Sequence, residues 1–327
     1  MSLSLDVLTV GETLIDLIST EESASGLRGA QTFTKYLGGS PANIAVYVAK
    51  LGGNAAVISK TGIGAFGKFL KDELRYHGVN TQYLVMDHRV HTTIIFVSRT
   101  QDTPEFEALR NGDFQLTPAE VPVEAIERAK IVHASTFALS REPCRSAVIK
   151  ALRLAHEHGK IVSFDPNYSS IIWPDYQEAQ HVMSEVYRYA TITKPSLDDA
   201  NRFFGQGYSP QEYIKMFHEL GPKTVILTMG KDGVLISHDG QLLGYLPASK
   251  IKVVDVTGAG DSFWAGFLVA LLDKRSLEEC ALFAREVVNL KLTIVGHLPS
   301  TIDCNEIYVN LPDPKQAIVK RMFNAIF

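Results

Sequence analysis

Short apolar runs alternate with amphipathic segments along most of the chain, and this alternation predicts an α/β fold. Runs typical of buried strands cover residues 5–11, 55–60, 131–135, 161–165, 190–194 and 224–229. Helical spacing of apolar residues lies between most of them, at 66–77, 143–158, 176–189, 197–204 and 210–220. A further helix is expected from Ser40 as its N-cap, with Pro41 in the first turn and Gly52-Gly53 as the stop. Such alternation predicts a mostly parallel sheet with helices on both faces and ligands at the carboxyl ends of its strands.

Two polar, strand-like segments interrupt this pattern, at about 14–36 and 92–114. Because no helix separates their parts, they predict a small sheet outside the main layers, and a pair of surface hairpins is the alternative. The sequence shows no internal repeat and no linker between independent domains, so we expect a single domain over residues 1–327.

Composition narrows the class of protein. Hydrophobic residues make up 46% of the chain and charged residues 21%, with a net charge of −4, which is globular and gives no basic surface for nucleic acid. No apolar run is long enough to span a membrane, and the N-terminus lacks a signal-peptide pattern, so we expect a cytoplasmic protein. Cys144, Cys280 and Cys304 lack metal or redox spacing and are expected to be free thiols.

The strongest chemical signal is the segment Asp255-Val256-Thr257-Gly258-Ala259-Gly260-Asp261, which precedes an apolar helical pattern. Gly258 and Gly260 allow consecutive backbone N–H groups to converge on an anion, and the N-terminus of the following helix favours the same charge. Asp261 would then take a proton from a substrate hydroxyl while these N–H groups stabilise a transferring phosphoryl group. The alternative is an acid that only favours a helix N-terminus.

A second motif, Gly38-Gly39-Ser40-Pro41-Ala42-Asn43, lies far upstream. With both motifs in this order, the chain resembles the PfkB or ribokinase-like family of ATP-dependent sugar and nucleoside kinases nearly end to end. The resemblance implies a ribokinase-like three-layer α/β/α fold with a mostly parallel central sheet. It also implies that the segments at about 14–36 and 92–114 form a small β lid, which often supplies a homodimer contact.

The resemblance assigns roles around the reacting centre. It implies Asp261 as the base, with Gly258, Ala259 and Gly260 as the anion-binding turn. The sugar would be held by a set of residues from the first half of the chain: Asp16, Gly38, Gly39, Asn43, Arg110 and Asn167. Three alternatives stay open: Asp16 points outward from an edge strand, the glycines form a plain turn beside a surface Asn43, and Arg110 is exposed on a hairpin.

Nucleotide and cation sites follow from the same resemblance. The implied ATP contacts are Thr228, Gly230, Gly233 and Asn289, although a plain turn explains the glycines equally well. Asp199 would hold Mg²⁺ through water in an element resembling the family's Asn-x-x-Glu, or else is a helix-start acid. Asp255 and Thr257, with carbonyl groups near Gly296, would bind a monovalent cation such as K⁺.

The leading hypothesis is an ATP-dependent kinase that converts fructose to fructose 6-phosphate. Ser169 stands where many relatives carry an arginine, which favours a neutral sugar, while Arg110 keeps 2-keto-3-deoxygluconate kinase or a related acid-sugar kinase as the runner-up, ahead of nucleoside kinases. Outside this class, the Gly-x-Gly-x-x-Gly pattern at 62–67 with Asp87 downstream suggests an NAD-dependent dehydrogenase. A catalytically silent binding protein with a kinase fold is the other alternative.

Overall fold

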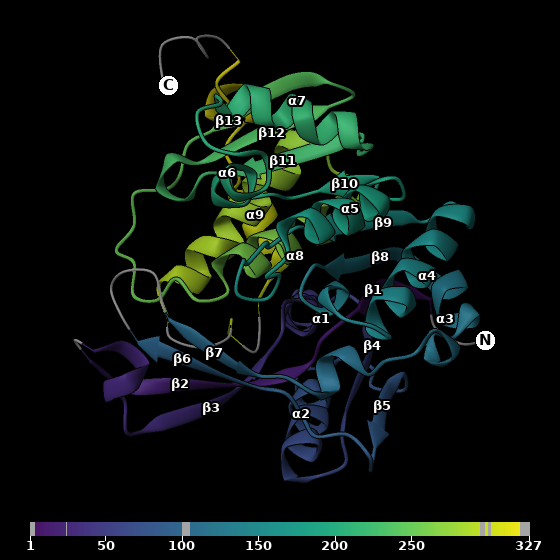
Figure 1. Cartoon of the computed structure of the whole chain (residues 1–327). Helices are drawn as coiled ribbons and strands as arrows, with labels where there is room; N and C mark the ends of the chain where they lie inside the picture. The colour runs from purple at the N-terminus through teal and green to yellow at the C-terminus, as the bar shows by residue number, and fades with distance from the viewer. Residues whose placement is uncertain (1–3, 24, 100–104, 295–297, 300–301, 321–327) are drawn as a thin grey trace.

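The computed structural model describes residues 4–23, 25–99, 105–294, 298–299 and 302–320, and these residues form a layered α/β structure (Figure 1). Within them, the central sheet has nine strands. Their spatial order is β13 (Gln241–Leu246), β12 (Val234–His238), β11 (Thr224–Thr228), β10 (Ile192–Thr193), β9 (Ile161–Asp165), β8 (Ala129–Ser135), β1 (Leu5–Val10), β4 (Ala55–Gly62) and β5 (Leu84–Asp87). Neighbours pair in parallel except that β12 is antiparallel to both β11 and β13.

Helices cover both faces of this sheet and bury two separate hydrophobic cores. The first core contains side chains of α3 (Val123–Arg128), α4 (Cys144–Glu157), α5 (Tyr176–Tyr187), α6 (Leu197–Phe204) and α7 (Pro210–Leu220). The second contains those of α1 (Ser40–Lys50), α2 (Ala65–Tyr76), α8 (Ala259–Leu272) and α9 (Leu277–Leu292), with α10 (Cys304–Asn310) and α11 (Pro314–Ala317) following α9. Because successive side chains of a strand point to opposite faces, Leu8 and Val10 enter the first core and Val7 the second.

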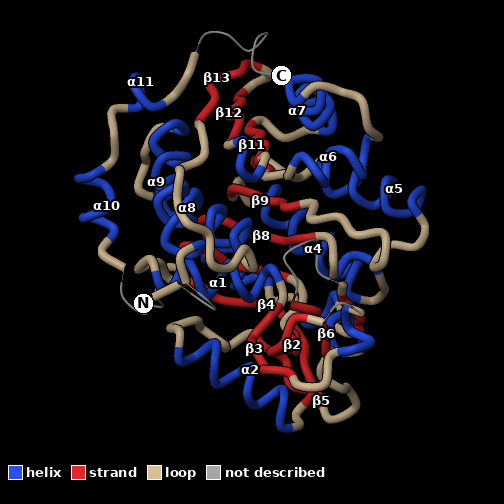
Figure 2. The backbone as a smooth tube through the Cα atoms, turned by 90° about the vertical axis from the view of Figure 1, so that its left-hand side faces the viewer, coloured by secondary structure: helices blue, strands red, loops and turns tan. Residues whose placement is uncertain are grey.

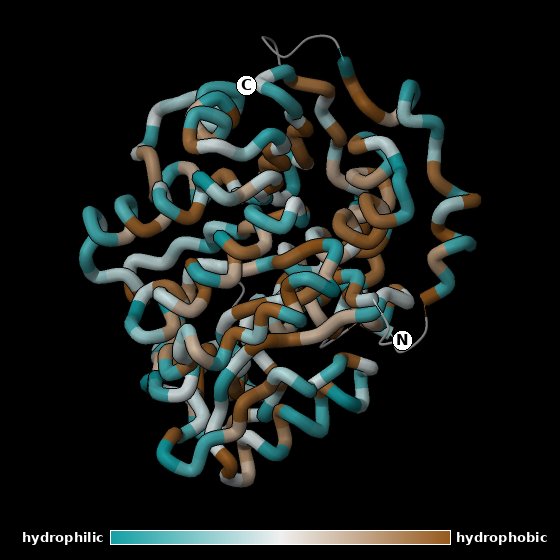
Figure 3. Tube along the Cα trace, turned by 90° about the vertical axis from the view of Figure 1, so that its right-hand side faces the viewer, coloured by the Kyte–Doolittle hydropathy of each residue, from teal (hydrophilic) through white to brown (hydrophobic). Residues whose placement is uncertain are grey.

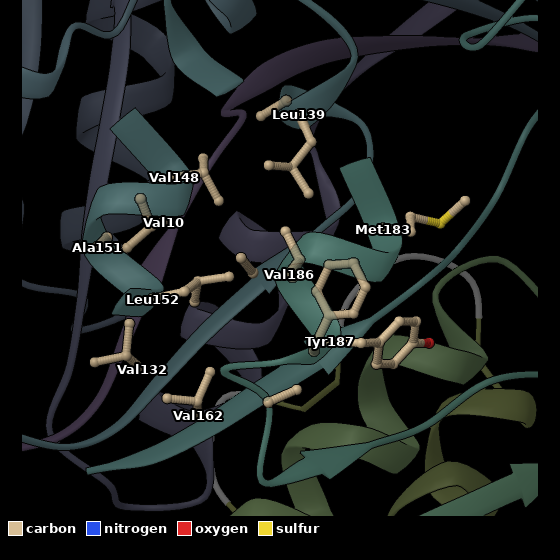
Figure 4. Close-up of a cluster of buried hydrophobic side chains, with 14 of the residues drawn as sticks. Val10, Val132, Leu139, Val148, Ala151, Leu152, Val162, Met183, Val186 and Tyr187 are labelled. Atoms are coloured by element: carbon tan, nitrogen blue, oxygen red, sulfur yellow. The ribbon is translucent and has the colours of Figure 1, made fainter. Parts of the chain in front are cut away.

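The first core is packed between the sheet and α4 and α5. Val132 of β8 and Val162 of β9 lie toward Leu152 of α4 and Tyr187 of α5 in a close-up of this cluster (Figure 4). The tube coloured by hydropathy shows the polar positions gathered mainly on the outer turns (Figure 3). Short 3-10 turns connect several elements: η1 (Gly26–Gly29), η2 (Gly112–Phe114), η3 (Pro118–Glu120), η4 (Ala138–Ser140) and η5 (Gly230–Asp232).

A separate four-stranded sheet lies beyond the end of β1 (Figures 1 and 2). Its order is β3 (Phe33–Gly38), β2 (Leu14–Glu22), β6 (Ile94–Arg99) and β7 (Phe106–Leu109). The segments at about 14–36 and 92–114 therefore pair with one another and not with the main sheet. Since β2 follows β1 after three residues, the small sheet is held at the carboxyl end of a central strand.

The α/β class and the mostly parallel sheet are confirmed, and the differences are local. Ser40 is not the N-cap of α1, because Gly39 holds that place with φ 97° and the Ser40 hydroxyl donates to Asp261 instead. Gly52, with φ 87°, does follow the end of α1 as predicted. The strand expected at 190–194 is only Ile192–Thr193. No helix in the described part of the chain combines the length and apolar character that crossing a membrane requires.

Candidate active site

The centre of the candidate site is Asp261 in the first turn of α8. Gly258 is the N-cap with φ 72°, in the left-handed region, and a Cβ there would lie 2.8 Å from the Tyr47 hydroxyl oxygen. The Asp261 carboxylate accepts a hydrogen bond from the Ser40 hydroxyl (2.8 Å) and another from the Asn43 side-chain amide (2.9 Å). These two bonds join the motif at 38–43 to the motif at 255–261 across 218 or more residues of sequence.

Burial raises the pKa of Asp261, while the bonds from Asn43 and Ser40 and the charge of Lys194 oppose that rise. A carboxylate with a raised pKa is a stronger proton acceptor, which suits a general base. The alternative of an acid that only favours the helix N-terminus does not explain two side-chain donors from another helix.

Asp16 approaches the same place from β2. It is half-buried, and among the described residues no group donates a hydrogen bond to its carboxylate. Burial and the nearby charge of Asp261 raise its pKa to about 7. A Cβ on Gly38, in the neighbouring strand β3, would collide with its carboxylate. Asp16 therefore points inward over a glycine, and not outward from an edge strand.

Glu12 is a site residue that the sequence analysis missed. It follows β1, and its side chain is buried with one oxygen accepting from the Ser40 backbone N–H (3.2 Å) and the Ser135 hydroxyl (3.3 Å). The other carboxylate oxygen is buried without a hydrogen-bond partner, and burial raises the pKa of Glu12 to about 8. A Cβ on Gly39 would lie 2.7 Å from the Glu12 carbonyl oxygen. The sequence signal that could have identified Glu12 is an acidic residue directly after a predicted buried strand.

Lys194 and Asp165 form a second missed pair, at the carboxyl ends of β10 and β9. Their side chains are buried, and Lys194 Nζ lies 2.8 Å from Asp165 Oδ2. Burial lowers the pKa of Lys194, but the charges of Asp165, Asp199 and Asp261 and the hydrogen bond to Asp165 together outweigh it and hold that pKa above its ordinary value. A Cβ on Gly260 would lie 3.4 Å from Nζ, so this ammonium group faces the anion-binding turn. Asp165 Oδ1 has no hydrogen-bond partner, and burial raises the pKa of Asp165 to about 6.

Arg110 does not project from a hairpin into solvent. Its side chain is 5% exposed, and its Nη2 lies 2.5 Å from the buried Asp113 carboxylate. Nη1 donates to the Ser140 hydroxyl (2.7 Å), and the guanidinium group lies over the Phe137 ring. Every nitrogen of the guanidinium group is thus already hydrogen-bonded within the protein.

The residues expected at the nucleotide are mostly engaged in local structure. Asp199 forms a capping box with Ser196 at the start of α6, and its other oxygen accepts from the Tyr168 backbone N–H (2.8 Å). Thr228 donates to the Pro195 carbonyl oxygen (3.4 Å). A Cβ on Gly233 would collide with the Leu246 carbonyl oxygen, so close packing alone explains a glycine at this position.

The remaining candidates lie at the edges of the site. Gly230 has φ 56° with open space around it, and Asn167, at φ 33°, is exposed just after β9. The Asn289 amide donates to the Ser249 hydroxyl (2.8 Å) and to Glu286 (3.1 Å). Asp255 accepts from the Thr257 backbone N–H (2.9 Å), while Gly296 lies outside the described residues.

The Gly-x-Gly-x-x-Gly pattern at 62–67 has a packing explanation. A Cβ on Gly67 would collide with the Gly62 carbonyl oxygen, and Asp87 is paired with Arg89 (3.0 Å) and Lys60 (3.3 Å). Asp87 is therefore not available for a ribose, and the pattern follows β4, which is not the first strand.

The fold and the site are those expected of a phosphotransferase that acts on a hydroxyl group, because a buried carboxylate lies beside a glycine-rich turn at a helix N-terminus. Residues 4–300 match the family model described as pfkB family carbohydrate kinase. The chain belongs to this family, and the prediction of an ATP-dependent carbohydrate kinase is confirmed. The dehydrogenase alternative is wrong.

Individual relatives agree with this assignment. The chain is 36% identical to an ATP-dependent 6-phosphofructokinase of Thermoanaerobacterium thermosaccharolyticum, over 92% of each chain. It is 35% identical to fructokinase-1 of Oryza sativa subsp. japonica, over 90% of this chain and 94% of the relative. Among solved structures, a fructokinase of Halothermothrix orenii superposes with TM-score 0.76 at 39% identity, covering 90% of this chain and 100% of the other. An uncharacterized sugar kinase from Pyrococcus horikoshii in complex with ATP has TM-score 0.82 at 30% identity, covering 92% and 96%.

Proposed function

We propose that the protein transfers the γ-phosphoryl group of ATP to the 6-hydroxyl of fructose. The observation that carries the proposal is the Asp261 carboxylate, which is held by Ser40 and Asn43 beside the anion-binding turn and faces the unpartnered Asp16. Asp261 takes the proton of the attacking hydroxyl, and the N–H groups of Ala259 and Gly260 stabilise the charge on the moving phosphoryl group.

Sugar binding in this proposal uses the polar groups that the protein leaves without partners. Asp16 accepts hydrogen bonds from sugar hydroxyls, and the buried Asn43 side-chain oxygen, which also lacks a partner, accepts another. Gly38 and Gly39 contribute to the sugar site by leaving room for the Asp16 carboxylate and for the Glu12 backbone. The small sheet β3-β2-β6-β7 carries Asp16, and we propose it as the lid over the sugar and as the homodimer contact within a single-domain protein.

The preference for a neutral sugar rests on Arg110. An acid sugar needs a cation for its carboxylate, and the Arg110 guanidinium group is buried in its pair with Asp113. Relatives named as fructokinases support fructose within the neutral sugars.

Magnesium fits the carboxylates around Lys194. Asp165, Asp199 and Asp261 outnumber this one ammonium group, and Asp165 Oδ1 is buried without a partner. No group of three metal-ligating side chains is found in the described residues, which agrees with a Mg²⁺ ion held mainly by phosphates and water. Asp199 and Asp165 would hold it through water, and it would offset the charge of the ATP phosphates. For ATP itself we propose contacts with Thr228, Gly230, Gly233 and Asn289.

The test is ATP consumption with fructose, fructose 6-phosphate, 2-keto-3-deoxygluconate, ribose and adenosine as acceptors. We expect kcat/KM for fructose to exceed the others by about tenfold or more, with a phosphate ester at the 6-position identified by ³¹P NMR. Activity confined to the acid sugar or to fructose 6-phosphate would replace the fructose assignment. Absence of ATP turnover with every acceptor would refute the proposed reaction.

A further inference from the structure

A buried lysine lies against the carboxylate that begins the anion-binding turn. Lys291 is in the last turn of α9 and its side chain is 1% exposed. Its Nζ lies 3.2 Å from Asp255 Oδ2, while Asp255 Oδ1 accepts from the Thr257 backbone N–H. A Cβ on Gly258 would lie 3.9 Å from Lys291 Cε, so the lysine stem runs directly behind the turn. The backbone N–H of Val254 also donates to the Leu292 carbonyl oxygen (2.7 Å), which ties the two segments together.

The negative charge of Asp255 has to be offset by a positive charge if the adjacent turn is to stabilise a phosphoryl group. One oxygen of this carboxylate accepts from the Thr257 backbone N–H and the other lies 3.2 Å from Lys291 Nζ, which are the contacts of an ionised carboxylate. A carboxylate three residues before Gly258 opposes the build-up of negative charge on a phosphoryl group at that turn. A cation beside the carboxylate offsets this repulsion. It also holds the carboxylate in place and, because the carboxylate accepts a hydrogen bond from Thr257, fixes the conformation of the turn.

The family resemblance implied a monovalent cation site at Asp255 and Thr257, with carbonyl groups near Gly296. In the structure an ammonium group with the same single positive charge contacts the Asp255 side chain. Lys291 brings that charge within the polypeptide, so no ion has to be recruited from solution. The residues present therefore do not fit a K⁺ site built on the Asp255 carboxylate.

We propose that the ammonium group of Lys291 takes the place of a monovalent metal ion at Asp255, and that catalysis by this protein is independent of K⁺. The activity readout rests on the proposed kinase function. The stability readout below needs neither sugar nor ATP, so failure of one is distinguishable from failure of the other.

The first experiment uses the unaltered protein. Phosphorylation of fructose is measured in KCl, NaCl and tetramethylammonium chloride at equal ionic strength, with ATP supplied as a salt free of alkali metal. Because the charge is built in, kcat/KM stays within about twofold across the three salts. Stimulation by K⁺ of about tenfold or more, the effect of supplying a missing charge at the turn, overturns the proposal.

A pair of substitutions tests Lys291 directly. Lys291→Ala removes the ammonium group and opens space, so activity in tetramethylammonium chloride falls by about tenfold or more and KCl restores most of it. Lys291→Met removes the charge but keeps the length of the side chain, so KCl restores little. Lys215→Ala, at an exposed lysine on α7, is the control and shows no salt-specific change. Full activity of Lys291→Ala in the absence of K⁺ contradicts the proposal.

Thermal unfolding gives the readout that does not depend on turnover. The Tm of Lys291→Ala without substrates is higher in KCl than in tetramethylammonium chloride, because K⁺ binds the vacated position only in the folded state. The unaltered protein shows no such difference. A K⁺-specific rise in the Tm of the unaltered protein contradicts the proposal, and this comparison holds whether or not Lys291→Ala folds.

Discussion

The proposed sugar side and the proposed nucleotide side of the site differ in how many of their polar side chains already have hydrogen-bond partners. On the sugar side, Asp16 has no hydrogen-bond donor among the described residues, and one side-chain oxygen each of Asn43 and Glu12 is buried without a partner. On the nucleotide side, the side chains of Asp199, Thr228 and Asn289 have partners within the protein, and the exception is Asp165, whose Oδ1 is buried without one.

This difference indicates where each ligand is recognised by side chains. A buried polar group without a partner costs about 1–3 kcal/mol of folding free energy, and a ligand that supplies the partner recovers it. Polar groups that already have partners contribute little to ligand binding. We therefore expect the nucleotide to be bound mainly by backbone N–H groups and the helix N-terminus. Substitutions on the sugar side should therefore have the larger effects on ligand binding.

The largest effect is expected from Asp261→Asn, at the point where the two sides meet. An amide cannot take the proton of the attacking hydroxyl, so kcat falls by about 10²- to 10⁴-fold while KM for the sugar stays within about threefold. Steady-state kinetics with fructose measure both values. Asp198→Asn, at an exposed acid in the first turn of α6, is the matched control. Equal losses in the two variants would support the view that Asp261 acts only as a helix-start acid.

Next in size is Asp16→Asn, which tests the sugar side alone. Loss of a charged acceptor raises KM for fructose by about ten- to a hundredfold, with a smaller change in kcat. Because the pKa of Asp16 is raised from 3.8 to about 7 in the folded protein, stability is lost progressively between these pH values as the unfolded chain ionises, and the full loss is present above pH 7. The free energy of unfolding of Asp16→Asn at pH 8 therefore rises relative to the unaltered protein, by about 1 kcal/mol or more. If Asp16→Asn raises KM for fructose but does not raise the free energy of unfolding in urea, the ionised Asp16 carboxylate does not destabilise the folded protein.

Residues within the two glycine-containing motifs were predicted better than side chains that reach the site from elsewhere. The two glycine-containing motifs identified Asp261 and Asn43, and the structure brings them into contact. The resemblance also implied a sugar-binding role for Asp16, and the structure places its carboxylate against Gly38 and not outward from an edge strand. These residues lie close to the backbone features that the motifs define, so their positions follow from local structure.

Long side chains and capping groups were harder to predict. Lys194 and Lys291 reach the anion-binding turn from other elements, and the sequence does not show where their ammonium groups end. Arg110 was expected at the substrate but pairs with Asp113, only three residues away. Ser40 was expected as a helix cap, but a tertiary contact with Asp261 takes its hydroxyl. In each case the competing partner is distant in sequence or depends on burial, neither of which a local pattern encodes.

A pH profile gives an intermediate effect on the sugar side. An acid with a pKa of about 7 loses its charge as the pH falls through that value, so the form of Asp16 that accepts sugar hydroxyls is lost below it. We expect kcat/KM for fructose to fall by roughly tenfold between pH 7.5 and pH 6. In Asp16→Asn this loss disappears. An identical profile in both proteins would assign the titration to another group.

The smallest effect is expected from Asn289→Ala on the nucleotide side. Its amide already donates to Ser249 and Glu286, so its removal takes little binding energy from ATP, and KM for ATP changes by less than about threefold.

The comparison is sharpest against Asn43→Ala, where the same chemical change removes a donor to Asp261 and a buried oxygen that has no partner. That variant should lose about tenfold or more in kcat/KM for fructose. If Asn289→Ala instead weakens ATP binding as strongly as Asn43→Ala weakens sugar turnover, the hydrogen bonds of Asn289 exchange readily for contacts with the nucleotide. The hydrogen bonds that a side chain makes in the free protein would then not predict whether it binds a ligand, on either side of the site.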